Sequence, residues 1–516
     1  MGTVVSSGQT FESYTSPRLA PPLNRGLFAT IDFDIGGDIL HIEKPFLAVL
    51  DTDRLTDTCA GCFGAKHLEK VTDVKLRACS ACQVPKYCDK TCQVKDWNLG
   101  HRLECSIFKA LKPRILPINA RAILRILLRM SATVKFAYTD RELELFELLE
   151  SHKNDIHHQN ASAWERMTLT SMAVKHYSGT DIELEKLLEL SAKLDVNSFS
   201  LTTATYDRIG VYIHPYAAIM NHDCEYNSIV GFDGSEMYVK AIRPIKEGEQ
   251  IFISYVDATN RHDVRQKELL ERYYFSCRCA RCVREEKHRL EVPDAVSYAS
   301  ALLGSNSASS HTSDELMGTI MRLIKLPWSL LEQPLVALVD EYVATLISEN
   351  EITSAISAAA LRYLHIDPAL YSEAHPLRIV HAWVLAKLAI HASASTPVMA
   401  LEVYGEKPDC AMNKGGEKVS VHALSIAWSV LNRLVTEKGE SCVVPALKET
   451  IGTAFTQVHE ELLRQGTELW ETKDEVAAQL TKIDRAARSL VGEQAMKAIK
   501  QVLRPEVSSG QLGFYH

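Results

Sequence analysis

The stretch Asn221-His222-Asp223-Cys224 decides the fold, because it combines polar residues with a metal ligand. Cys224 stands apart from other cysteines, and the next ones along the chain form the cluster Cys277-Arg278-Cys279-Ala280-Arg281-Cys282. Structural zinc takes four ligands in a tetrahedron, so three thiolates at this spacing leave the metal one ligand short. We therefore expect Cys224 to be the fourth ligand, which ties a C-terminal tail back to the Asn-His pair and forms a pocket between them.

Length and composition restrict the class of protein. A chain of 516 residues is long enough for more than one domain. Its net charge of −8 argues against nucleic acid as the main partner. We expect no membrane span, since no run of about 18 apolar residues occurs, and no secretory signal at Met1 to Thr10. The 13 cysteines are mostly clustered, which in a long chain indicates zinc in a reducing cytosol or nucleus.

A second group of ligands lies within residues 59–105. It forms four pairs: Cys59 and Cys62, Cys79 and Cys82, Cys88 and Cys92, and His101 and Cys105. Eight ligands fill two closed tetrahedral sites. The members of the last pair are four residues apart, so they share one face of a helix. We expect a cross-braced module, in which the first and third pairs bind one zinc and the second and fourth pairs bind the other.

Segments of β type flank this zinc module on both sides. In order, the chain reads as a β region at 11–50, the zinc module at 59–105, a helical stretch at 106–195, a second β region at 196–256 and a tail at 257–290. Asp233-Gly234 separates two apolar runs and predicts a hairpin. The two β regions are expected to form one domain that the zinc module splits.

Beyond a Ser-rich segment that ends near Asp314, almost everything reads as helix. Residues 315–516 carry amphipathic periodicity in the segments 315–326, 328–348, 352–364, 376–393, 418–437, 444–465 and 474–503. Paired helices with short breaks predict an array of α-hairpins resembling tetratricopeptide (TPR) stacks, although a strict repeat signature is absent. Residues 404–417 are expected to form a loop.

The eight-ligand module resembles a MYND zinc finger. The match rests on the complete ligand spacing, with Tyr87 and Trp97 in place as well. Fingers that resemble this one bind proline-containing peptides in a groove at positions like Gln93 and Trp97, and an exposed aromatic residue beside a rigid module suits such recognition. A zinc module with a purely structural role is the alternative.

Four further motifs resemble those of SET-domain lysine methyltransferases and their post-SET zinc: Asn24-Arg25-Gly26-Leu27-Phe28, Asn221-His222-Asp223-Cys224-x2-Asn227, Gly248 to Tyr255, and Phe275-x-Cys277-x-Cys279-x2-Cys282. Each motif alone is weak. In this order, with a finger after the first, they resemble the SET and MYND domain (SMYD) family, and Ser372 to Arg378 resembles a segment of that family's C-terminal domain. The resemblance implies an α+β fold: a split β-rich SET domain with an inserted finger and a post-SET zinc site, followed by an all-α, TPR-like domain.

The resemblance also implies a reaction, the transfer of a methyl group from S-adenosylmethionine to a lysine of a histone or another protein, and with it a role in chromatin regulation. Deprotonating lysine at pH 7 costs about 4–5 kcal/mol, because its reference pKa is about 10.4. A dry aromatic channel beside a cationic sulfonium lowers this cost, since desolvation and like charge both disfavour the ammonium. Phe199 and Tyr255 match the residues that line this channel, and Tyr255 would orient the amine for in-line attack. Three zinc ions would be structural.

The family pattern further implies residues that hold the cofactor: Arg25, Gly26, Glu150, His152, Asn197, Asn221, His222, Tyr255, Tyr273 and Phe275. Tyr273 and Phe275 would pack beside the adenine. Taken alone, Gly26 is a turn glycine, and Glu150 and His152 are residues of a helix surface. Two residues depart from the pattern. Arg25 stands where the family often has Asn, and Asp223 stands where Ser is usual, which adds a negative charge between the cofactor site and the zinc and puts activity in question.

Two other functions compete with catalysis. The chain could be a SET and MYND scaffold, catalytically weak or inactive, that recruits protein partners, because a fold alone does not guarantee activity. A nucleic-acid-binding finger protein is disfavoured by the net charge. We expect a monomer in the cytoplasm, the nucleus or both.

Overall fold

The computed structural model describes residues 14–21, 23–68, 75–132, 138–286, 292–304, 311–326, 333–395, 398–403, 417–436, 442–465 and 473–502. The chain divides into two compact units, of which the first comprises Met1–Ala258, His262–Lys287 and Ser441–Thr450, and the second comprises Thr259–Arg261, His288–Glu440 and Ile451–His516. The predicted C-terminal domain ran unbroken from 315 to 516, whereas the structure groups Ser441–Thr450 with the first unit. Among the helices that the structure describes, none combines the length and the apolar character that crossing a bilayer needs.

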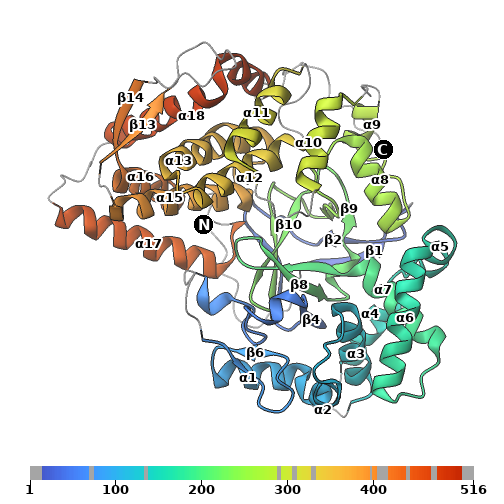
Figure 1. Ribbon diagram of the computed structural model, residues 1–516. Helices are drawn as coiled ribbons and strands as arrows, with labels where there is room; N and C mark the ends of the chain where they lie inside the picture. Colours follow the sequence, from blue (N-terminus) through green and yellow to red (C-terminus); the bar gives the residue numbers. More distant parts are fainter. Residues whose placement is uncertain are drawn as a thin grey trace. The chain divides into compact units, whose positions relative to one another are not determined.

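Three sheets form the core of the first unit. The strand orders are β1 (Thr15–Leu19), β2 (Arg25–Ala29), β12 (Gln250–Ile253) and β9 (Asn221–His222); β10 (Ser228–Asp233), β11 (Glu236–Ala241) and β3 (Asp38–Ile42); and β4 (Leu47–Leu50), β8 (Arg208–Ile213) and β7 (Phe199–Thr202). Antiparallel pairing joins β2 to β12, β3 to β11 and β4 to β8. Each sheet thus combines strands from both sides of the finger (Figure 1), which confirms the split β domain.

The turn between β10 and β11 is the predicted Asp233-Gly234 hairpin. Asp233 pairs with Glu236, so Gly234 and the following serine form a two-residue loop. Gly234 has a φ of 62°, which glycine adopts without steric cost. A Cβ on Gly234 would lie 2.8 Å from the carbonyl oxygen of Cys62, so this glycine also lets the finger approach the sheet.

The finger consists of short elements that bury little by themselves. They are the 3-10 turns η2 (Asp53–Leu55) and η3 (Ala65–His67), the paired strands β5 (Arg77–Ala78) and β6 (Lys86–Tyr87), helix α1 (Lys90–Asp96), the π-helical turn η4 (Trp97–His101) and helix α2 (Arg102–Leu111). Asp89 caps α1, because its carboxylate accepts a 2.8 Å hydrogen bond from the Cys92 N–H. His101 and Cys105 lie one helical turn apart, at the junction of η4 and α2.

The stretch predicted to be helical at 106–195 continues from α2 into α3 (Ile118–Met130), α4 (Asp140–Glu147), α5 (Lys153–Gln159), α6 (Ala161–Ser178) and α7 (Leu184–Asn197). A capping box at Thr139 and Glu142 begins α4. Helix α3 packs against α2 of the finger, strand β4, and helices α6 and α7. After the second β region, which includes the turn η5 (Ala217–Ile219), helices α8 (His262–Tyr273) and α9 (Ala280–Glu286) form the tail.

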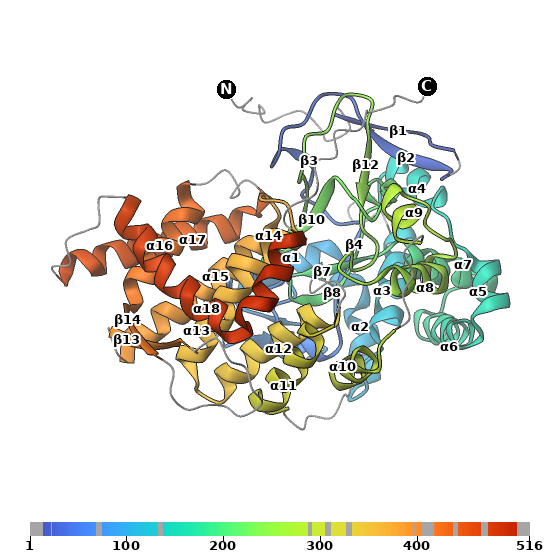
Figure 2. The same cartoon turned by 90° about the horizontal axis from the view of Figure 1, so that it is seen from above.

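The second unit is mostly helical. It contains α10 (Asp294–Gly304), α11 (Ser313–Ile324), α12 (Leu335–Ser348), α13 (Ile352–Leu361), η6 (Arg362–Ile366), α14 (Asp367–Leu370), α15 (Pro376–Ser395), α16 (Ala423–Thr436), most of α17 (Pro445–Arg464), and α18 (Lys473–Val502). Helices α11, α12, α13, α15 and α16 each pack on the next, and α18 packs on α13 and α16 (Figure 2). Successive packing of this kind agrees with the predicted helical array.

The prediction that this domain is all-α was wrong at one place. Strands β13 (Val398–Val403) and β14 (Glu417–His422) form an antiparallel pair. In β13, buried Met399, Leu401 and Val403 alternate with exposed residues, and this period of two is typical of a strand with one buried face. The helix predicted at 418–437 therefore begins only at Ala423. Of the predicted loop at 404–417, all but Glu417 lies outside the described residues.

Candidate functional site

Among the residues that the structure describes, three groups of ligand atoms gather in the first unit. The atoms of each group lie within 4.8 Å of one another: Cys59, Cys62, Cys88 and Cys92; Cys79, Cys82, His101 and Cys105; and Cys224, Cys277, Cys279 and Cys282. A tetrahedral zinc with Zn–S bonds of about 2.3 Å places two sulfurs about 3.8 Å apart. The Sγ–Sγ distances Cys62–Cys88 and Cys79–Cys105 are both 3.8 Å. The thiols are free, and the groups fit three closed zinc sites, two of them cross-braced.

The third zinc site fastens the tail. Cys224 follows β9, while Cys277 and Cys279 precede α9 and Cys282 lies in it. The buried apolar cluster at this place consists of three of these cysteines together with Val256 and Leu269. A cluster this small supplies little hydrophobic stabilisation, so the fold of the tail depends on the metal.

His222 links this zinc site to the end of β12. Its Nδ1 accepts a 3.0 Å hydrogen bond from the backbone N–H of Tyr255, and its Nε2 lies 3.3 Å from the Cys224 Sγ. A backbone N–H can only donate, so in the neutral ring the proton is on Nε2 and points to the sulfur. Burial lowers the pKa of His222 to about 4, which agrees with a neutral ring.

The Asn-His pair lies beside β12 through an unusual contact, a parallel pairing. Asn221 is in register with Phe252, and His222 with Ile253. The side chain of Asn227, fully buried, fixes this crossing: its Oδ1 accepts a 2.8 Å hydrogen bond from the Phe252 N–H, and its Nδ2 donates to the Gln250 carbonyl at 2.8 Å. Asn221 in turn donates from Nδ2 to the Arg25 carbonyl oxygen at 2.7 Å.

A cavity of about 920 Å³ opens beside these residues. Its lining includes all but one of the predicted catalytic and cofactor-binding residues: Arg25, Glu150, His152, Asn197, Phe199, Asn221, His222, Tyr255, Tyr273 and Phe275. The volume is at the upper end of the range for ligand pockets, roughly 300–1,000 Å³, so the cavity has room for a cofactor and a substrate side chain.

Gly26 is the predicted residue that does not line the cavity, and its place in β2 shows why it is a glycine. A Cβ there would lie 2.2 Å from Gln250 Nε2 and 3.0 Å from Asn221 Nδ2. Gly26 is therefore a residue of close approach in a strand, paired with Arg18, rather than the turn glycine of the alternative. It lets the amide of Asn221 reach the Arg25 carbonyl.

Part of the cavity lining is polar. The Glu150 carboxylate accepts a 2.9 Å hydrogen bond from Asn24 Nδ2, and the Glu150 carbonyl accepts one of 2.7 Å from Asn197 Nδ2. His152 precedes α5 with a left-handed φ of 48°, and its Nδ1 lies 2.9 Å from an oxygen of Asp155. Glu150 and His152 lie between α4 and α5, so the helix-surface alternative does not describe them.

Another part of the lining is aromatic. The rings of Tyr255 and Tyr273 are 4.9 Å apart, and the hydroxyl of Tyr273 lies 3.4 Å from the Tyr255 carbonyl oxygen. The ring of Phe275 lies 6.1 Å from His222 and edge-on to Tyr255. The Tyr255 hydroxyl donates a 2.6 Å hydrogen bond to the Met220 carbonyl. Phe199 begins β7 and lines the same cavity.

Sequence reasoning missed several residues of this lining. Asn24 fixes Glu150, and Tyr206, Tyr226 and the apolar residues of β10 also line the cavity. Asn24 stands in the first quoted motif, and its left-handed φ of 63° suits asparagine. The sequence could therefore have indicated this residue. Tyr206 has a φ of 69°, which the sequence does not signal for a tyrosine.

Asp223, the departure that put activity in question, does not line the cavity. Its Oδ1 accepts a 2.7 Å hydrogen bond from the Glu225 N–H, which closes a local turn after β9. Burial raises the pKa of its carboxyl group.

We expect the substitution Asp223→Ser to change the dissociation constant for S-adenosylmethionine by less than about twofold, because a serine hydroxyl closes the same kind of turn. Isothermal titration calorimetry of the two proteins measures the difference. A tenfold change in either direction would show that the charge of Asp223 acts on the cavity.

Comparisons with known proteins agree with this arrangement. The family model for the SET domain matches residues 24–256. The chain is 31% identical over 327 residues to SET domain and MYND-type zinc finger protein 6 of Schizosaccharomyces pombe, covering 63% of either chain. The chain is similar to proteins of the SMYD family. Two further SMYD relatives are histone-lysine N-methyltransferase SMYD3 of Mus musculus, 31% identical over 264 residues, and N-lysine methyltransferase SMYD2-A of Danio rerio, 29% identical over 274 residues.

The matches with these SMYD relatives are partial. They cover 49% and 52% of this chain, and 57% and 60% of SMYD3 and SMYD2-A. The chain thus spans about three fifths of the length of the curated relatives it matches. A solved SET domain, that of LSMT bound to lysine and AdoHcy, is 13% identical to this chain. The match covers 92% of this chain and 95% of that one, and its TM-score of 0.26 is too low for a structural argument.

Proposed function

We propose that this protein is an S-adenosylmethionine-dependent protein-lysine N-methyltransferase that acts on histones or other proteins. The observation that carries this proposal is one cavity of about 920 Å³, whose lining combines polar residues such as Glu150 and Asn197 with aromatic residues such as Tyr255 and Tyr273. Polar groups suit the ribose and amino-acid groups of the cofactor, and aromatic groups suit an aliphatic side chain that must shed its water.

The polar groups at the Asn-His pair fit the cofactor by their chemistry. When bound, S-adenosylmethionine supplies an electrophilic methyl group on a cationic sulfur. Asn221 and Asn197 offer amides, and Glu150 offers a carboxylate whose second oxygen is not used by Asn24. Phe275, placed against His222, offers an aromatic face beside these groups.

The aromatic part of the lining would act on the lysine. Burial raises the pKa of Tyr255 above its usual value, so its hydroxyl stays protonated and is not a general base. Because the O–H donates to the Met220 carbonyl, the lone pairs of the phenolic oxygen remain able to accept an N–H of the substrate amine. That hydrogen bond would fix the direction of the amine lone pair. Tyr273 and Phe199 would exclude water from the aliphatic stem, which favours the neutral amine.

The protein is expected to bind S-adenosylmethionine with a dissociation constant in the micromolar range, about −8 kcal/mol at 1 μM. The variant Asn221→Ala loses a half-buried amide and its bond to β2, so the constant should rise about tenfold. Calorimetry measures both, and Asn432→Ala, on α16 of the other unit, is the control variant. A flat titration of folded wild-type protein would contradict the proposal.

Part of the finger is suited to hold a peptide. Trp97 and Val94 are 36% and 47% exposed, and Gln93 precedes Val94 on α1. These residues support the proposal that the finger binds proline-containing peptides, which is also the property that a partner-recruiting scaffold would use. We further propose a monomer that works in the cytoplasm, the nucleus or both.

A further inference from the structure

Strand β4 is an edge strand, and a row of arginine side chains, here called the ladder, donates hydrogen bonds to carbonyl groups along its free edge. Helix α3 provides the three rungs: Arg121 Nη2 donates to the Leu50 carbonyl at 2.9 Å, Arg125 Nη1 to that of Ala48 at 3.2 Å, and Arg129 Nη1 to that of Phe46 at 2.5 Å. Four residues of helix rise about 6 Å, and two residues of strand about 6.6 Å, so the rungs match the spacing of the carbonyls. The ladder satisfies polar groups that a sheet edge would otherwise leave unpaired.

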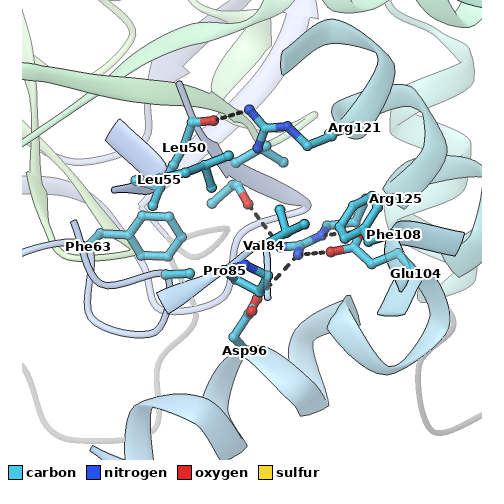
Figure 3. A pocket seen from close by; sticks show the side chains of 13 residues that line it. Leu50, Leu55, Phe63, Val84, Pro85, Asp96, Glu104, Phe108, Arg121 and Arg125 are labelled. Carbon is cyan, nitrogen blue, oxygen red and sulfur yellow. Dashed lines mark hydrogen bonds and ion pairs between the residues drawn. The ribbon is translucent and has the colours of Figure 1, made fainter. Parts of the chain in front are cut away.

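The middle rung also reaches into the finger. Arg125 Nε donates to Glu104 Oε2 at 3.1 Å, its Nη2 pairs with Glu104 Oε1, and the same Nη2 lies 3.3 Å from Asp96 Oδ1. Figure 3 shows this guanidinium between the Glu104 and Asp96 carboxylates, beside a cavity of about 30 Å³. All three side chains are buried. The finger and strand β4 thus share one arginine.

Glu104 connects Arg125 to a zinc ligand, His101. Its Oε1 lies 3.5 Å from Nδ1 of His101, while His101 Nε2 lies 3.5 Å from the Cys82 Sγ. Nε2 therefore faces the metal ligands, and Nδ1 faces the carboxylate. A carboxylate behind a zinc-bound histidine fixes the ring and raises its basicity, and losing such a partner commonly weakens metal binding by about 10- to 100-fold.

The other side of Arg125 connects to the candidate active site. Ala48 is in register with Tyr212 of β8, and Tyr212 is in register with Phe199 of β7. One row of the sheet therefore runs from the carbonyl that Arg125 holds to a residue that lines the large cavity.

We propose that Arg125 and Glu104 couple zinc at the His101 site to strand β4, so that this zinc helps to hold the sheet that carries Phe199. The finger is then a structural part of the methyltransferase core as well as a peptide-binding module. The effect of this zinc on activity, through Phe199, rests on the proposed function. The coupling of this zinc to β4 does not.

The test compares two arginines of one helix. Arg125→Lys keeps the charge but cannot make the forked contacts with Glu104 and Asp96. Arg121→Lys is the matched control, because Arg121 holds the same strand through Leu50 but its hydrogen bonds go to Leu116, Leu50 and Thr52. Zinc release to a chromogenic chelator is measured on the folded, zinc-loaded chain. We expect one of three zinc ions to leave at least tenfold faster in Arg125→Lys and at the wild-type rate in Arg121→Lys.

Hydrogen exchange of β4 gives the second measurement. In Arg125→Lys, where the zinc of the His101 site is expected to leave fastest, partial removal of zinc should raise exchange in the segment 47–50 in proportion to the loss of the fastest-leaving zinc. Equal zinc release in both lysine variants, or β4 exchange that does not follow zinc loss, would overturn the coupling. If Arg125→Lys does not fold, Glu104→Gln replaces it with the same expected acceleration, and exchange in that variant decides.

A methyl-transfer assay on a short lysine peptide keeps the two proposals apart. Activity that falls with the fastest-leaving zinc supports the step to Phe199, and full activity without that zinc overturns it. A wild-type protein with no transfer at all would count against the proposed function, while zinc release and exchange would still decide the coupling.

Discussion

Replacing Tyr255 by phenylalanine is expected to slow methyl transfer by about 100-fold, which corresponds to about 2.7 kcal/mol of transition-state stabilisation. The phenolic oxygen of Tyr255 lines the cavity and can accept an N–H of the substrate amine while its own proton is held by the Met220 carbonyl. Without it the amine loses its orientation, but the aromatic wall and the cofactor residues stay in place. The turnover number should therefore fall while cofactor affinity stays within about twofold of wild type.

Tyr138→Phe is the matched control for this prediction. Tyr138 is also a buried tyrosine of the first unit, and its hydroxyl donates to the Phe46 carbonyl at 3.0 Å, but it does not line the cavity. Both variants lose one buried hydrogen bond, with a similar expected cost of about 1 kcal/mol in the free energy of unfolding. Equal turnover in the two variants would remove Tyr255 from the reaction.

The substitution Cys279→Ser is expected to abolish most cofactor binding. It removes one of four ligands from the zinc that fastens the tail, and the tail carries Tyr273 and Phe275 into the cavity. Val256 and Leu269 are the buried apolar residues besides cysteines at this place, so hydrophobic burial holds the tail only weakly and the metal adds to polar contacts such as that of buried Arg265 with Glu285. We expect zinc content to fall from three to two ions per chain and the dissociation constant for S-adenosylmethionine to rise at least about tenfold.

Elemental analysis and calorimetry on the same preparation test this together. Cys442→Ser is the control, since Cys442 is a buried thiol of the first unit that lies outside the three ligand groups. That variant should keep three zinc ions and the wild-type affinity. If Cys279→Ser binds two zinc ions and the cofactor with unchanged affinity, the tail is held by contacts other than the metal.

Much of the site could be predicted because its signals are local. Thiol pairs at short spacing bring their ligand atoms together within one turn or one helix face, so the three ligand groups followed from the sequence. The split sheet followed from β-type segments on both sides of the finger, and β2 does pair with β12. The motif around Asn221 and His222 also predicted a place beside the residues of the first strand, and Asn221 bonds to the Arg25 carbonyl.

The rest depends on contacts between residues far apart in sequence. Tyr273 was predicted beside the adenine, and this place stays a prediction; its ring lies 4.9 Å from that of Tyr255, a contact between distant residues that the sequence did not indicate. In the sequence, the arginines of α3 occupy the polar positions of an amphipathic helix. Their carbonyl partners follow only from the packing of α3 on β4. The hairpin of β13 and β14 was missed because its period of two is short and adjoins a long helical pattern.

The cavity is proposed to transfer methyl groups to lysine. The most direct test incubates the zinc-loaded protein and S-adenosylmethionine with an array of intact proteins and peptides, and locates the modified residue by mass spectrometry, with Tyr255→Phe run in parallel. We predict methylated lysines on a defined set of targets with wild-type protein and about 100-fold fewer with the variant. Cofactor binding without any methylated lysine would contradict the account and favour a scaffold.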